Sequence, residues 1–107
     1  MNDDKEKKIG ILGYGEIGKA VARFYKSPLI KDIDTNEFVV NLDVLHVCIP
    51  FIDNFYEVVS EIITEYRPHL VIIHSTVGVG ETKKLYDRFG NVVHSPVRGV
   101  HPNLYEG

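Results

Sequence analysis

Three glycines near the start of the chain constrain its fold more than any other feature. Residues 10–25 read GILGYGEIGKAVARFY, so Gly13, Gly15 and Gly18 follow the spacing G-x-G-x-x-G. A short apolar stretch precedes them, and apolar residues recur at helical spacing after them. The spacing alone is weak evidence, but a strand before it, a helix after it and an acid downstream are the context of a dinucleotide-binding loop. The segment therefore predicts a cofactor loop in preference to an ordinary strand-to-helix turn.

Each glycine in such a loop has its own physical task. The first permits the tight turn, the second lets the backbone approach the pyrophosphate, and the third lets the helix pack closely on the strand. The N–H groups at the start of the helix then face the anion. Glu16 puts a negative charge near the phosphates, unless its side chain points to solvent or caps the helix.

An acid at the end of the second predicted strand distinguishes the two nicotinamide dinucleotides. Asp32 and Asp34 are both candidates, and Asp32 is favoured because it lies nearer the strand end. A carboxylate there accepts hydrogen bonds from the adenosine ribose and repels a 2′-phosphate. NAD is therefore the expected cofactor, in preference to NADP.

Apolar runs that alternate with helical patterns predict an α/β fold. Strands are expected at 7–12, 28–34, 43–50, 70–74 and 92–96, and helices at 16–26, from an N-cap at Asp53 to Tyr66, and at 81–89. This order implies a doubly wound, Rossmann-like and mostly parallel sheet of about five strands, with helices on both faces. The link between Asp34 and Asp43 is too short for a crossover helix, so we expect either a loop across the sheet edge or a stub strand in EFVV at 37–40.

Length and composition limit the class of protein. The 107 residues fit a single dinucleotide-binding domain over 1–107, with 1–6 as a flexible tail and 97–107 as an irregular C-terminal tail. A net charge of −3 gives no support for nucleic-acid binding. The one cysteine, Cys48, permits no internal disulfide, and no apolar run approaches the roughly 20 residues of a membrane helix. We expect a cytoplasmic protein without nucleic-acid or membrane partners, with a homodimer as one option.

Three segments of the chain resemble a known family. IGILGYGEIGKAVA, DVLHVCIP and especially VIIHSTVGVGETKKL are similar to the NAD-binding domain of the UDP-glucose dehydrogenase and 6-phosphogluconate dehydrogenase superfamily. The similarity extends from about Lys8 to Pro96. It implies that Ser75 and Thr76 contact the cofactor, and that Ile49, Pro50 and Phe51 flank it.

The glycine loop, the acid and the resemblance together give the expected cofactor site. Its residues are Gly13, Tyr14, Gly15, Glu16, Ile17, Gly18, Asp32, Ile49, Pro50, Ser75 and Thr76. The chain departs from the family in ways that affect catalysis: no residue matches the catalytic lysine or cysteine, and we expect the family's substrate domain to be absent from this chain. The catalytic residues are therefore unknown.

Histidines and one arginine raise further options at the same edge of the sheet. His74 and His94 end neighbouring predicted strands, where either could act as a general base. A substrate is expected near His94 and Arg98, because an arginine there could bind a carboxylate or phosphate. A zinc or iron site from His74, His94 and His101 is conceivable, but the sequence has no H-x-x-x-H or C-x-x-C spacing, so no metal is predicted.

Three hypotheses of function remain open. The first is the NAD(H)-binding domain of a dehydrogenase-like oxidoreductase that acts on a hydroxyl-bearing metabolite, such as a sugar nucleotide or a hydroxy acid, and is incomplete for catalysis alone. The second is a stand-alone NAD-binding or nucleotide-sensing module without catalytic activity. The third is a Rossmann-like interaction domain without a cofactor, because a fold does not settle a function.

Overall fold

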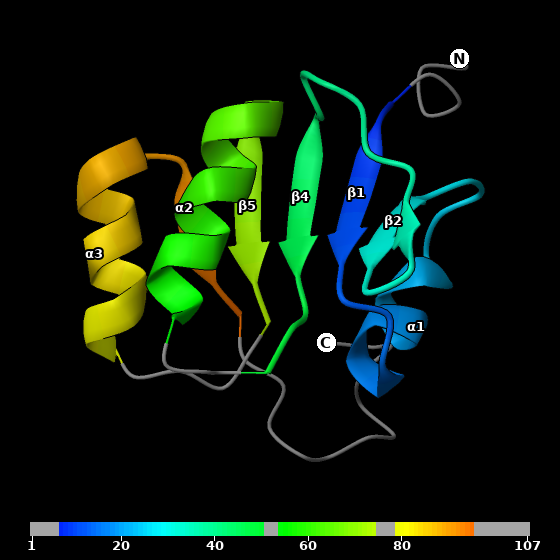
Figure 1. Ribbon diagram of the computed structural model, residues 1–107, viewed down its shortest axis with the longest axis horizontal. Helices are drawn as coiled ribbons and strands as arrows, with labels where there is room; N and C mark the ends of the chain where they lie inside the picture. The colour runs from blue at the N-terminus through cyan, green and yellow to red at the C-terminus, as the bar shows by residue number, and fades with distance from the viewer. Residues whose placement is uncertain (1–6, 51–53, 75–78, 96–107) are drawn as a thin grey trace.

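The computed structural model describes residues 7–50, 54–74 and 79–95. Over these residues the chain is an α/β protein with a six-stranded sheet and three helices (Figure 1). The strands are β1 (Ile9–Leu12), β2 (Leu29–Asp32), β3 (Thr35–Asn36), β4 (Val44–Val47), β5 (Leu70–Ile73) and β6 (Val92–His94). The helices are α1 (Glu16–Ala22), α2 (Phe55–Tyr66) and α3 (Val79–Phe89).

The strand order of the sheet is β3-β2-β1-β4-β5-β6. All neighbours are parallel except β2 and β3, which form an antiparallel pair. The chain runs outward from β1 to β2 and then returns to the other side of β1 as β4. The mostly parallel α/β sheet is therefore confirmed, and the carboxyl ends of β1 and β4 lie next to each other.

The prediction of about five strands was one short, because the link after Asp32 folds back on β2. Asp32 pairs with Thr35 across a two-residue turn, which makes β3 a stub at the sheet edge. The stub lies at Thr35–Asn36, before the EFVV segment considered for it. Within that segment Phe38 is buried against the core, so its side chain serves packing.

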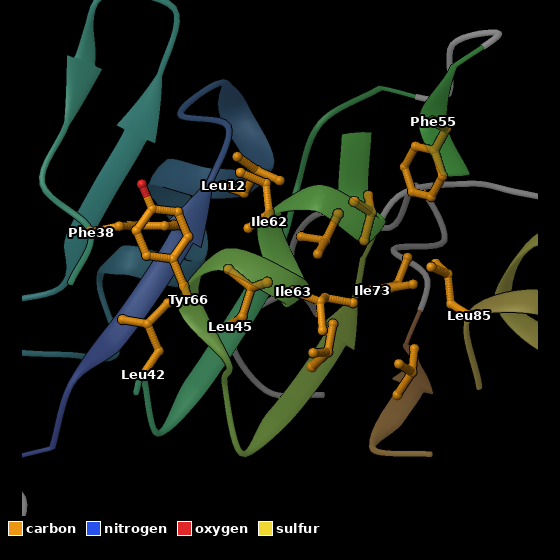
Figure 2. Close-up of a cluster of buried hydrophobic side chains, with 14 residues drawn as sticks. Leu12, Phe38, Leu42, Leu45, Phe55, Ile62, Ile63, Tyr66, Ile73 and Leu85 are labelled. Atoms are coloured by element: carbon orange, nitrogen blue, oxygen red, sulfur yellow. The ribbon is translucent and has the colours of Figure 1, made fainter. Parts of the chain in front are cut away.

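One face of the sheet carries most of the apolar core. Side chains of α2 point at the strands and meet residues of β1, β4 and β5 (Figure 2). Period-two alternation explains which strand residues belong to this core, because every second residue of a strand faces the same side. The buried members are Leu12, Phe38, Leu42, Leu45, Val47, Phe55, Val59, Ile62, Ile63, Tyr66, Val71, Ile73, Leu85 and Val92.

The opposite face holds a smaller cluster around α1. Ile11 of β1, Val21 of α1 and Cys48 after β4 are buried together. Ile11 and Leu12 are consecutive in one strand, so the two clusters lie on opposite sides of the sheet. Figure 1 shows α1 near β1 and β2, and shows α2 and α3 near β5 and β6.

The helices differ from their predicted limits at three ends. Helix α1 ends at Ala22, not at residue 26, because the N–H groups of Arg23, Phe24 and Tyr25 turn to carbonyls three residues back. Helix α3 begins at Val79, two residues before its predicted start. The predicted N-cap Asp53 and the predicted tails at 1–6 and 97–107 lie outside the described residues, and Asn54 takes the N-cap position of α2.

Candidate functional site at the carboxyl edge of the sheet

Gly13 makes the turn from β1 into the loop before α1. Its φ is +95°, a conformation that glycine adopts without the steric cost of a side chain. Its N–H donates to the Lys31 carbonyl at 2.8 Å, which fixes the loop to β2. A Cβ on Gly13 would lie 2.9 Å from Cγ2 of Ile49 and 3.0 Å from the Cys48 carbonyl carbon. The position therefore requires glycine for both its backbone conformation and its space.

Gly15 and Gly18 have opposite surroundings. A Cβ on Gly15 would have no heavy atom within 4 Å, so the backbone there is open to a ligand. A Cβ on Gly18 would overlap the Gly13 carbonyl oxygen, so its absence lets α1 pack tightly on the loop. The three glycines thus have three different environments: a strained turn, an open backbone and a close helix contact. These match the three tasks of a dinucleotide loop.

Asp32 lies beside this loop at the end of β2. The Tyr14 N–H donates to Oδ2 of Asp32 at 3.3 Å. Asp32 is exposed, so its carboxylate also has accepting capacity toward solvent. Asp34 lies in the turn between β2 and β3, two residues after the last residue of β2. Of the two candidate acids, the structure brings Asp32 to the glycine loop.

The other predicted residues of the glycine loop differ in exposure: Tyr14 and Glu16 lie at the surface, and Ile17 is partly buried. Glu16 is exposed in the first turn of α1, where an acid interacts favourably with the helix start. Tyr14 is 39% exposed, with the Lys19 ammonium 5.7 Å from its ring centroid. Ile17 packs against the apolar cluster of Ile11. Its side chain therefore supports the helix, and only its backbone is available to a cofactor.

The loop after β4 lies directly against the glycine turn. Ile49 is partly buried and packs against the main core, and its N atom would lie 3.0 Å from a Cβ on Gly13. Pro50 is exposed. The structure therefore places Ile49 against the glycine loop. Four other residues considered at the sequence level, Phe51, Ser75, Thr76 and Arg98, lie outside the described residues, as does His101.

A hydrogen-bonded row of side chains crosses the α1 face of the sheet. The Tyr25 hydroxyl lies 2.7 Å from Nε2 of His46, and Nδ1 of His46 lies 2.9 Å from Nε2 of His74. The two imidazole rings stack with centroids 5.1 Å apart. His46 lies in the middle of β4 and is buried, and His74 directly follows β5. The row links the chain after α1 to two central strands.

The proton positions in this row are coupled. Each of its two contacts needs one donor and one acceptor, so in the neutral row the tautomer of one histidine sets that of the other. A hydrogen bond to the Ser95 backbone raises the pKa of His74. Nε2 of His74 is engaged with His46 in this row.

Burial keeps the row neutral. It lowers the pKa of His46 to about 4, with the nearby His74 as the second cause. Burial also lowers the pKa of His74, His94 lowers it further, and the Ser95 hydrogen bond acts in the opposite direction. Burial raises the pKa of the Cys48 thiol to about 12, so this cysteine stays protonated and serves packing.

Sequence reasoning considered His74 but missed its partners. His46 reads as part of an apolar strand, and Tyr25 as part of a helix, so neither signals a polar contact. The available signal was register: His46 pairs with Ile72, which puts His74 two residues farther along the same face. His94 follows in the adjacent strand, opposite Ile73.

Residues 7–50, 54–74 and 79–95 contain no group of three or more histidine, cysteine, aspartate or glutamate side chains that could hold a metal ion. Within the same residues, no helix has the length and apolar character needed to cross a membrane. In comparisons with known proteins, no family model, curated protein or solved structure matches the chain.

Proposed function

We propose that the chain binds NAD(H) at the glycine loop, as the cofactor-binding part of a dehydrogenase-like oxidoreductase. The observation that carries the proposal is the contrast among the three glycines. Gly13 makes the turn, Gly15 leaves the backbone open, and Gly18 permits the close helix contact. A turn that served packing alone would not need an open glycine between two crowded ones.

The sheet supports the same proposal. The strand order changes direction at β1, with β2 on one side and β4 on the other. In open α/β sheets, ligands bind outside the carboxyl ends of the strands at such a point. The glycine loop lies there, between β1 and α1. We interpret the sheet as a doubly wound, Rossmann-like arrangement in which the diphosphate rests on the Gly15 backbone.

Asp32 supports NAD over NADP. Its carboxylate is exposed and held beside the loop by the Tyr14 N–H. At this place a carboxylate accepts from the ribose hydroxyls and repels a 2′-phosphate. The hydroxyl-bearing substrate, a sugar nucleotide or a hydroxy acid, follows from the sequence resemblance and is proposed on that basis alone.

The test is a titration of the purified chain with NADH and NADPH, followed by isothermal calorimetry. We expect NADH to bind and NADPH to bind more weakly. Gly15→Val fills the open space above the loop and should abolish NADH binding while the fold persists. Gly80→Val in α3 is the matched control, because a Cβ on Gly80 also meets no atom within 4 Å. A folded wild-type chain that ignores NADH, or a Gly15→Val variant that binds it normally, would refute the proposal.

Asp32→Asn tests the choice of cofactor separately. The substitution keeps the size of the side chain and removes its charge. We expect weaker NADH binding and a smaller difference between NADH and NADPH. An unchanged preference would show that another group makes the distinction.

A further inference from the structure

A concave site lies at the amino ends of β1 and β4, at the opposite end of β1 from the glycine loop. It has a volume of about 760 Å³, within the range of small-molecule sites. Ile9 and Val44 form part of its lining, and they are register partners at the amino ends of β1 and β4. The segment from Phe24 to Ser27, which follows α1, forms another part.

The short first helix explains why this site is open. Helix α1 runs from the carboxyl edge toward the amino edge and ends after seven residues, about 10 Å of helix. It packs on Ile11, and beyond its end the segment from Phe24 to Ser27 borders the amino ends of β1 and β4. Phe24, just past the helix, is 55% exposed. The result is an apolar hollow bordered by a turn.

The charged side chains that the structure describes around the hollow are of one sign. Lys7 and Lys26 both line it, and among the described residues no aspartate or glutamate does. Neither lysine forms an ion pair within the described residues. The chain as a whole carries a net charge of −3, so this local positive character runs against the overall charge. An ammonium group next to apolar surface suits a carboxylate or phosphate attached to an apolar body.

Tyr25 gives the hollow a fixed wall. Its hydroxyl is held by His46 at 2.7 Å, and its ring lies 5.4 Å from the His46 ring by centroids. Because its hydroxyl is hydrogen-bonded, the Tyr25 ring is held in one orientation. A preorganised wall of this kind favours a ligand of defined shape.

We propose that this hollow binds a soluble amphipathic organic anion, an acyl or aryl carboxylate or phosphate. The apolar body lies against Ile9, Val44 and Phe24, and the anionic group faces Lys7 and Lys26. The site is separate from the proposed cofactor loop, since it lies at the other end of β1. Its occupation does not depend on NAD(H) binding.

The test is a titration of the ¹⁵N-labelled chain with octanoate, followed by amide chemical shifts. We expect saturable shifts at Ile9, Tyr25, Lys26 and Val44. Octyltrimethylammonium, with the same apolar chain and the opposite charge, should bind about tenfold more weakly or less. Equal affinity for the two probes, or shifts centred elsewhere, would overturn the proposal.

Two variants and a membrane arm sharpen the result. Lys7→Gln with Lys26→Gln should weaken octanoate binding about tenfold, and Lys83→Gln with Lys84→Gln on α3 should leave it unchanged. An unchanged affinity in the first pair would also overturn the proposal. In sedimentation with phosphatidylglycerol vesicles, the chain should stay in the supernatant. If the chain co-sediments with the vesicles and the Lys7→Gln, Lys26→Gln double variant does not, the ligand is a lipid surface and the proposal is overturned. NADH binding by these variants tests the cofactor proposal independently.

Discussion

Among the residues that the structure describes, α2 and α3 cover a cluster of fourteen buried apolar residues on one face of the sheet, and α1 covers a cluster of three on the other. The smaller cluster lies beside the polar row of Tyr25, His46 and His74. The two faces share the same strands, so the difference arises from the helices and from alternate strand positions. Leu45 and Val47 face the large cluster, whereas His46 between them faces the row.

This difference separates the source of stability from the candidate chemistry. Apolar burial dominates folding free energy and has no directional requirement, so the α2 face can be filled by shape alone. The α1 face carries the glycine loop, the histidine row and the lysine-bordered hollow. A short helix leaves room for these groups because it covers less of the sheet. We therefore expect the largest losses of stability from core substitutions on the first face, and effects on ligands or on pH dependence from substitutions on the second face.

The largest effect is expected from Phe55→Ala. Phe55 is fully buried in the large cluster, so the variant loses its transfer free energy and leaves a cavity, at a cost of about 4 kcal/mol in unfolding free energy. Phe24→Ala is the matched control on the other face, where the side chain is 55% exposed, and should cost less than about 1.5 kcal/mol. Urea unfolding measures both. Equal losses would break the contrast between the faces.

The next largest effect is expected from acid, which should lower the free energy of unfolding through His46 on the α1 face. The pKa of His46 is about 4 when folded, below its ordinary 6.5, so the unfolded chain binds more protons between these values. The stability due to neutral His46 is complete above pH 6.5 and is lost as the pH falls toward 4, by about 3 kcal/mol at most. Unfolding free energy should therefore drop over this window, in wild type more than in His46→Gln.

A histidine outside the row provides the control for this pH effect. His69 is 73% exposed in its side chain, and its removal deletes one histidine without touching Tyr25, His46 or His74. We expect His69→Gln to keep the wild-type dependence of urea midpoint on pH. If His46→Gln and His69→Gln behave alike, the row does not govern acid sensitivity.

The sequence was most informative where a pattern is local. The five main strands and the three helices were predicted near their observed positions, because burial on both faces produces continuous apolar runs and one-sided burial produces helical spacing. The glycine spacing likewise predicted a loop whose three glycines meet three distinct environments. Asp32 was chosen over Asp34 by its place at the strand end, and it is the one that contacts Tyr14.

What the sequence did not predict depends on contacts between distant segments. The early end of α1 follows from three backbone hydrogen bonds that composition does not reveal. The β3 stub follows from a two-residue turn at 33–34 and from Glu37, directly after β3, which bonds back to Ile30 of β2. The link of Tyr25, His46 and His74 requires both the strand order and the position of the chain after α1. None of these has a signature within one short window.

A smaller loss of stability is expected from Gly18→Ala. The added Cβ would overlap the Gly13 carbonyl oxygen, which belongs to backbone and cannot simply rotate away, so we expect a cost of about 2 kcal/mol. Gly15→Ala adds the same methyl group where no atom lies within 4 Å, and should change unfolding free energy by less than about 0.5 kcal/mol. Thermal unfolding compares the two. A similar cost at both positions would show that the loop rearranges as a whole.

The smallest effect is expected on the outer surface of α3. Lys83 and Asp87 form an ion pair at 3.3 Å, one helical turn apart, with side chains 70% and 58% exposed. Solvent and salt screen such a pair, so Lys83→Ala should change unfolding free energy by about 0.4 kcal/mol, and 1 M salt should remove most of that difference. A loss comparable to that of Phe55→Ala would mean that stability does not reside mainly in the sheet-facing side of the helices. In that case stability could no longer be assigned mainly to the α2 face of the sheet, nor ligand binding to the α1 face.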